Sequence, residues 1–209
     1  MTLQSYLLFV AAAVALVFVP GPDMIYMLTR SVAQGRRAGI LAMLGINLGA
    51  YVHLVAAVTG LSAILAASSV AFTVIKWAGA AYLIYLGVRA LFSRTHPLAL
   101  GAGGREHASG KTIFWQGFWS DALNPKVAMF YLALLPQFVR PEAGHVTLQL
   151  LILGLTCNMV ALPINFVLVL LSSRVTETLR RNDALATWLN RAMGAMFIGL
   201  GLKLAAEKV

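Results

Sequence analysis

The sequence predicts an all-α integral membrane protein with six transmembrane helices, arranged as a 3+3 inverted repeat in which helices one and four are broken. Of its 209 residues, 60% are hydrophobic and 11% are charged, whereas soluble domains average about 45–50% apolar and about 25% charged residues. Because a transmembrane helix takes about 20 residues, the apolar positions suffice for about six spans. Basic residues lie between the apolar stretches, and prolines interrupt two of these stretches at matching places.

The formal net charge of +9 does not indicate a nucleic-acid partner. The basic residues are spread between apolar segments instead of lining one face, and the sequence has no nucleic-acid recognition motif. This distribution is typical of a membrane protein whose cytoplasmic loops are basic. We therefore expect the lipid bilayer, and no nucleic acid, as a partner of the chain.

Uncharged stretches mark the helices in chain order. The first, residues 2–22, lacks the basic start of a signal peptide, so we expect it to be retained. The stretch 38–75 is too long for one crossing of about 30 Å, and small and polar residues at 67–69 divide it. Residues 93–112, which contain glycines and no apolar periodicity, form a loop. The expected helices are 2–22, 38–66, 70–92, 113–138, 146–172 and 187–206.

Basic residues set the expected orientation. Eleven lie near the loops that follow helices one, three and five, and four lie on the other side. Because cytoplasmic loops carry the excess of Lys and Arg, we expect the odd-numbered loops in the cytoplasm and both termini outside. The eleven are Arg30, Arg36, Arg37, Arg89, Arg94, Arg105, Lys111, Arg174, Arg180, Arg181 and Arg191; the four are Lys76, Arg140, Lys203 and Lys208.

The chain is expected to be a single membrane domain, 1–209, built from two three-helix repeats, 1–92 and 113–209, which the cytoplasmic loop 93–112 connects. Two three-helix halves in series have opposite orientations, which is the inverted repeat common among secondary transporters. Similar segments recur in the same order in both halves. They are 18–22 with 122–126, Gly45 and Gly49 with Gly154 and Asn158, and 76–80 with 191–195.

Prolines interrupt the first and fourth helices. Pro20, Gly21 and Pro22 break helix one, and Asn124 and Pro125 break helix four, because proline lacks a backbone donor. Freed backbone groups cannot face lipid, so they bond to neighbouring helices or line a water-filled cavity. Paired breaks in equivalent helices point to a transport site, and two purely structural kinks are the alternative.

Three charged residues lie beside these breaks. Asp23 and Asp121 flank them, and Lys126 lies in the second one. A charge at the bilayer centre costs at least about 2.5–3.5 kcal/mol, so such groups usually face a cavity and pair with one another. We hypothesise that Lys126 pairs with Asp23 or Asp121 and that one carboxylate exchanges its proton for substrate. The alternative is that Asp23 caps a helix while Lys126 extends to the interface.

Other polar residues carry weaker signals. Asn47 can donate and accept hydrogen bonds, as a zwitterionic ligand requires, although membrane asparagines more often bond to a neighbouring helix. The small-residue face Gly45–Gly49 permits close helix contact, either within one subunit or between the copies of a homo-oligomer. His53 suits either proton relay or packing. The histidines and Cys157 have no metal-ligand or nucleophile spacing, so we expect no enzymatic activity, no cofactor and no metal site.

Four short segments, taken in order, are specific enough to suggest a family. They are Pro20-Gly21-Pro22-Asp23, Lys76 to Leu83 with Gly87, Asn124-Pro125-Lys126, and Leu135-Pro136-Gln137-Phe138. With these segments the chain resembles the LysE/RhtB family of bacterial amino-acid exporters over essentially its whole length, and its third helix is similar to that of the RhtB branch. The resemblance implies a multi-pass carrier in the cytoplasmic (inner) membrane that exports amino acids by proton antiport. Family members are described for lysine and arginine, homoserine and threonine, and leucine or other neutral amino acids.

The leading prediction is a secondary transporter that exports a neutral or small polar amino acid in exchange for protons. The substrate carboxylate would meet Lys126 or backbone amides, and its ammonium group would meet Asp23, Asp121 or a buried amide. A metal-ion exporter is one alternative, although two carboxylates are a thin ligand set for a divalent ion. A structural or sensory membrane subunit is the other, although a scaffold has no need of charges beside paired breaks.

Overall fold

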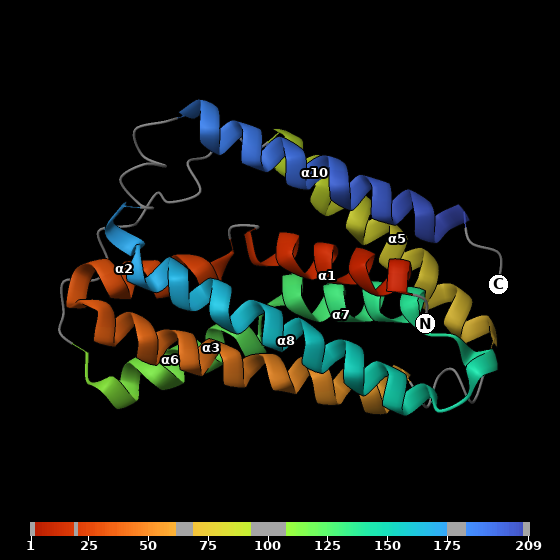
Figure 1. Cartoon of the computed structure of the whole chain (residues 1–209), viewed down its shortest axis with the longest axis horizontal. Helices are drawn as coiled ribbons and strands as arrows, with labels where there is room; N and C mark the ends of the chain where they lie inside the picture. The colour runs from red at the N-terminus through yellow and green to blue at the C-terminus, as the bar shows by residue number, and fades with distance from the viewer. Residues whose placement is uncertain (1–2, 19–20, 62–68, 93–107, 175–182, 207–209) are drawn as a thin grey trace.

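The computed structural model of the chain describes residues 3–18, 21–61, 69–92, 108–174 and 183–206. These residues form helices connected by short turns, and no strand occurs among them. Pro20 and most of the predicted loop 93–112 lie outside the described residues. Figure 1 shows the helices lying lengthwise beside one another as a bundle.

The first predicted helix is the beginning of a longer, broken element. α1, Leu3–Phe18, and α2, Pro22–Gln34, are bent by 55° relative to each other. Gly21 is the N-cap of α2, and Pro22 is its first residue. Proline is tolerated there because the backbone N–H of a first helical residue has no hydrogen-bond partner within the helix, so its absence costs nothing. The prediction that this element ends at residue 22 is therefore wrong, because the proline starts a new helix there. Arg30, predicted near a loop, lies inside α2.

The predicted break in the fourth element is present. α6, Gly110–Ala122, and α7, Pro125–Phe138, are separated by a two-residue turn. Asn124 is the N-cap of α7, and its side-chain oxygen accepts a hydrogen bond from the backbone amide of Lys126. The Asn124 cap therefore stabilises the start of α7 directly after the break.

The fourth element begins earlier than predicted. The side chain of Ser109 accepts a hydrogen bond from the backbone amide of Thr112 at 3.2 Å, which caps α6 so that it begins at Gly110. The sequence placed residues 110–112 in the loop 93–112. This boundary is wrong because a serine N-cap outweighs the lack of apolar periodicity in the first turn.

Two helices in the described part of the chain are long and apolar enough to cross a membrane, and the bent pair α1 and α2 makes a third if it is one span. The two are α8, Val146–Leu170, and α3, Arg36–Ala56, with the adjoining π-helix η1, Ala57–Leu61. α5, Ser69–Phe92, and α10, Asp183–Ala206, each have 24 residues. A short 3-10 turn, η2, lies between α7 and α8. The count of six spans stays a prediction.

Glycines allow two pairs of helices to approach closely. Gly45 and Gly49 of α3 and Gly117 of α6 each lie against the backbone of the other helix, so that an added Cβ would overlap it. The small-residue face Gly45–Gly49 thus contacts a helix of the same subunit. α5 and α10 form the second pair, in which Gly87 and Gly194 each lie against the other's carbonyl oxygen. Figure 1 shows α5 and α10 together at one side of the bundle.

Three pairs of helix contacts match when α1, α2 and α3 are compared with α6, α7 and α8, although α5 packs on α7 more extensively than α10 packs on α2. α3 packs on α6, and α8 packs on α1; α2 packs on α6, and α7 packs on α1; α2 packs on α3, and α7 packs on α8. In each case, replacing every helix by its counterpart in the other half converts one contact into the other. The main apolar core draws side chains from α1, α7 and α8, among them Phe9, Phe130 and Leu150.

Candidate functional site

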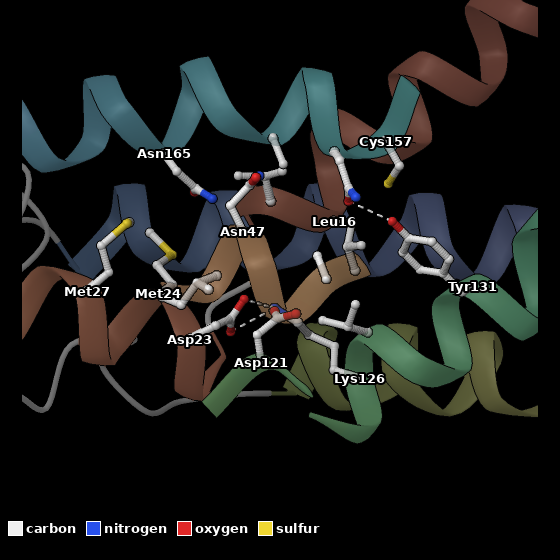
Figure 2. Close-up of a pocket in the computed structure, with 16 residues that line it drawn as sticks. Leu16, Asp23, Met24, Met27, Asn47, Asp121, Lys126, Tyr131, Cys157 and Asn165 are labelled. Carbon is white, nitrogen blue, oxygen red and sulfur yellow. Dashed lines mark hydrogen bonds and ion pairs between the residues drawn. The ribbon is translucent and has the colours of Figure 1, made fainter. Parts of the chain in front are cut away.

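A cavity lies where the two broken elements meet α3 and α8. The volume open to the centre of a water molecule is about 60 Å³. Figure 2 shows Asp23, Asp121 and Lys126 gathered together, with Asn47 and Asn165 drawn apart from them near α8. The lining residues are Leu16, Val17, Asp23, Met24, Met27, Ile46, Asn47, Ala50, Asp121, Lys126, Val127, Tyr131, Cys157, Asn158, Ala161 and Asn165.

The Asp23 carboxylate and the Lys126 ammonium group form an ion pair across the two breaks. Lys126 Nζ lies 3.3 Å from Asp23 Oδ1 and 3.5 Å from Asp23 Oδ2. Of the two partners considered for Lys126, Asp23 is the one within hydrogen-bond distance. The lysine side chain is 10% exposed, so it does not extend along the surface, and Gly21 rather than Asp23 is the N-cap of α2.

Asp23 in α2 and Lys126 in α7 have the same position relative to the starts of their helices. Each is the second residue of its half-helix and directly follows a proline at the first position. Aligning the two breaks on their N-caps, Gly21 and Asn124, differs by one residue from the pairing of 18–22 with 122–126. A helix N-terminus favours an anion and disfavours a cation. The negative charge of Asp23 thus offsets the unfavourable interaction of the Lys126 ammonium group with the N-terminus of α7.

The other residues predicted at the breaks shape the helix ends. Gly21, Pro22, Asn124 and Pro125 are not among the lining residues of the cavity. A Cβ at Gly21 would overlap both the Asp23 carboxylate and the end of the Lys126 side chain. Glycine at this N-cap therefore leaves room for the ion pair.

Asp121, in the last turn of α6, has a carboxylate oxygen without a hydrogen-bond partner among the described residues. The residue is 3% exposed, and the unpaired atom is Oδ2. His53 Nε2 lies 2.8 Å from the Asp121 backbone carbonyl and 4.0 Å from Oδ2. Because a carbonyl oxygen only accepts, Nε2 carries the proton. His53 thus caps the end of α6, and the Asp121 carboxylate can receive a cation from the cavity.

A second buried polar pair connects α7 and α8. The Tyr131 hydroxyl donates a hydrogen bond to Asn158 Oδ1 at 2.8 Å, drawn as a dashed line in Figure 2. Asn158 is 3% exposed, and its Nδ2 has no partner within the described ranges. Sequence reasoning missed Tyr131, because a tyrosine in an apolar helix is usually a packing residue, and no local pattern connects it to Asn158.

The described residues contain no group of three or more His, Cys, Asp or Glu side chains that could hold a metal ion. The residues that line the cavity instead include an ion pair, a carboxylate with one buried unpaired oxygen and an amide with a buried unpaired nitrogen. Such groups can bind a small molecule that carries both charges, without a metal.

A polar cavity formed where half-helices end inside an apolar bundle is typical of a membrane transport protein. The comparison of the chain with known families agrees: the LysE type translocator family matches residues 14–208. The chain belongs to this family and is a membrane transporter rather than an enzyme.

Curated relatives match along the whole chain. An uncharacterized membrane protein of Vibrio cholerae is 31% identical over 208 residues, covering 100% of both chains. The homoserine/homoserine lactone efflux protein of Salmonella typhimurium is 29% identical over 208 residues, 100% of this chain and 99% of that protein. The leucine efflux protein of Salmonella typhimurium is 28% identical over 201 residues, 96% of this chain and 94% of that protein. No solved structure matches the chain.

The single cysteine of the chain offers a test of the cavity. Cys157 lines it and is 5% exposed, so we expect a small methanethiosulfonate reagent to modify the thiol slowly and to inhibit transport as it does so. Substrate at ten times its Kd should slow the modification about tenfold, because only free protein reacts. Mass spectrometry of purified protein measures the rate, and Cys157→Ser, which should resist inhibition, is the control. Modification at the same rate with saturating substrate would place the substrate elsewhere.

Proposed function

We propose that the chain exports a neutral or small polar amino acid from the bacterial cytoplasm by secondary transport, in exchange for protons. The printed functions of the two Salmonella relatives, efflux of homoserine and homoserine lactone and efflux of leucine, support an amino-acid substrate.

The unpaired groups of the cavity are the observation that carries this proposal. An amino acid presents an ammonium group and a carboxylate on the same carbon atom. Asp121 Oδ2, which lacks a partner in the described part of the chain, is suited to the ammonium group. Lys126 is suited to the carboxylate, because it lies beside Asp121 in the lining of the cavity. The substrate then competes with Asp23 for Lys126.

The same carboxylate can couple substrate movement to protons. When the substrate leaves, Asp121 is a buried acid facing the cavity, and taking up a proton removes the cost of an unpaired charge. When the next ammonium group binds, that proton is released. One carboxylate that holds either a proton or a substrate produces antiport with no further coupling group.

For the topology, the proposal is six spans in a 3+3 inverted repeat, with both termini outside the inner membrane. The matched helix contacts and the equivalent positions of Asp23 and Lys126 support the repeat. Rocking of one half against the other around the cavity would expose the cavity alternately to each side.

Counterflow in proteoliposomes tests this function. Vesicles loaded with unlabelled amino acid are diluted into a trace of the labelled one, and we expect transient accumulation for small neutral amino acids. A pH gradient across the vesicles should drive net efflux of the same substrates. The proposal fails if no amino acid exchanges; movement of a divalent metal ion instead would favour the metal exporter, and movement of neither would favour a membrane subunit without transport.

A further inference from the structure

The polar lining of the cavity contains two kinds of group, charged side chains and amides. The charged part is Asp23, Asp121 and Lys126, which lie together in Figure 2. The amide part contains Asn158, together with Tyr131, which holds its side chain. The ammonium and carboxylate groups of an amino acid share one carbon atom, so both can be met in the charged part. The neutral amide part is then left for the side chain of the substrate.

The Asn158 amide presents its oxygen to the Tyr131 hydroxyl. A tyrosine hydroxyl has one proton to donate. Asn158 Oδ1 lies 2.8 Å from the hydroxyl oxygen and the Gly154 carbonyl lies 3.5 Å from it, and the Cys157 thiol is also within hydrogen-bonding reach. Of the two oxygens, Asn158 Oδ1 is the closer, so the amide NH₂ group is directed away from Tyr131. Asn158 Oδ1 thus already accepts one hydrogen bond, and the unpaired group of this amide is the Nδ2 donor.

That donor has no partner in the part of the chain that the structure describes. Asn158 Nδ2 is buried, in a residue that is 3% exposed. An unpaired buried donor is costly, and native structures keep few of them without a functional reason. A ligand in the cavity that brings an acceptor would remove this cost, whereas an apolar ligand would leave it.

We propose that Asn158, held by Tyr131, determines the substrate specificity by donating a hydrogen bond from Nδ2 to an oxygen in the substrate side chain. The preferred substrates are then small amino acids with a side-chain hydroxyl, and their methyl isosteres are disfavoured. This inference rests on the proposed amino-acid export. It adds to that function a residue that recognises the side chain of the substrate, whereas the charged residues recognise the ammonium and carboxylate groups common to all amino acids.

Threonine and valine are the matched pair of substrates for the test, because they differ only by a hydroxyl in place of a methyl group. Counterflow measured with each gives kcat/KM for both. A site that donates to a hydroxyl rejects the analogue lacking it, so we expect the wild-type protein to prefer threonine by at least about tenfold. Equal values for threonine and valine, or a preference for valine, would overturn the inference without any variant.

Asn158→Leu keeps the approximate shape of the side chain and removes the donor. We expect it to lower kcat/KM for threonine while valine is unchanged or improved, so that the ratio falls close to one. A residue with only a structural role would lower both values equally and leave the ratio unchanged, and that outcome would overturn the inference.

Two further variants keep the test decisive. Tyr131→Phe removes the hydroxyl that fixes the amide, so the ratio should fall even if Asn158→Leu does not fold. Thr156→Val is the matched control, because Thr156 is on the same helix, bonds to Tyr6 and the Ile152 carbonyl, and is not among the lining residues. Its ratio should equal that of the wild-type protein. If no amino acid exchanges at all, the proposed function fails; if threonine and valine exchange equally well, only the specificity inference fails.

Discussion

Replacing Asp121 with asparagine is expected to lower proton-driven amino-acid efflux by at least about a hundredfold. Asparagine keeps the shape and one acceptor oxygen, but it can neither carry the negative charge that meets an ammonium group nor bind and release a proton. Removing one partner of a buried charge pair costs about 3–5 kcal/mol, which is more than a hundredfold in affinity. Net efflux driven by a pH gradient in proteoliposomes is the measurement.

Proton release on substrate binding separates coupling from a general loss of activity. Adding substrate to wild-type protein in weakly buffered detergent should release protons, and Asp121→Asn should release none. Glu142→Gln is the matched control, because Glu142 is an exposed acid in the turn between α7 and α8 and should behave like the wild-type protein. The coupling proposal is wrong if Asp121→Asn retains the wild-type flux and its dependence on the pH gradient.

Removing Lys126 is expected to destabilise the protein and to abolish transport. Lys126→Gln leaves the Asp23 carboxylate without its partner, and Asp121 interacts electrostatically with both residues. The Asp23 and Asp121 carboxylates would then repel each other without a nearby cation. Breaking a buried pair costs about 3–5 kcal/mol, and we expect about 3 kcal/mol here because the side chains are 10% and 18% exposed. Thermal unfolding in detergent measures the loss as a lower Tm.

The double variant Asp23→Asn, Lys126→Gln tests whether the two residues stabilise the protein as an ion pair or independently of each other. Neutral amides at both positions leave no unpaired charge, so most of the lost stability should return. Transport should not return, because the substrate carboxylate still lacks its cation. If the double variant is as unstable as the two single losses added together, the charges do not stabilise each other and the ion pair is not what holds the two breaks together.

Some of this site could be predicted from residues that are close in sequence. A proline after an uncharged stretch marks a helix break, so the breaks at Pro22 and Pro125 were visible. Charged residues are rare in this chain, so Asp23, Asp121 and Lys126 stood out beside them. The continuation of the first element as α2 was missed, because polar and basic residues after Pro22 are typical of a loop. The helix continues because α2 packs against α3 and α6, and tertiary packing outweighs local composition.

Partnerships across the chain could not be predicted. Lys126 had two candidate partners, and the choice of Asp23 depends on how two half-helices that are 103 residues apart meet. His53 had no evident partner, because the carbonyl it caps is 68 residues away. Asn158 was one of several amides, and Tyr131 was indistinguishable from a packing residue until their hydrogen bond at 2.8 Å was seen.

The sequence by itself determined the chemical class of the protein: apolar composition requires a bilayer, proline requires helix ends, and charges in apolar surroundings require partners. These are properties of single residues and their neighbours, so they can be read without a fold. The tertiary structure alone decided which groups are satisfied and which are not. Asp23 and Lys126 satisfy each other, whereas Asp121 Oδ2 and Asn158 Nδ2 lack partners among the described residues. Whether a polar group has a partner depends on which helices are adjacent, and that is set by long-range packing.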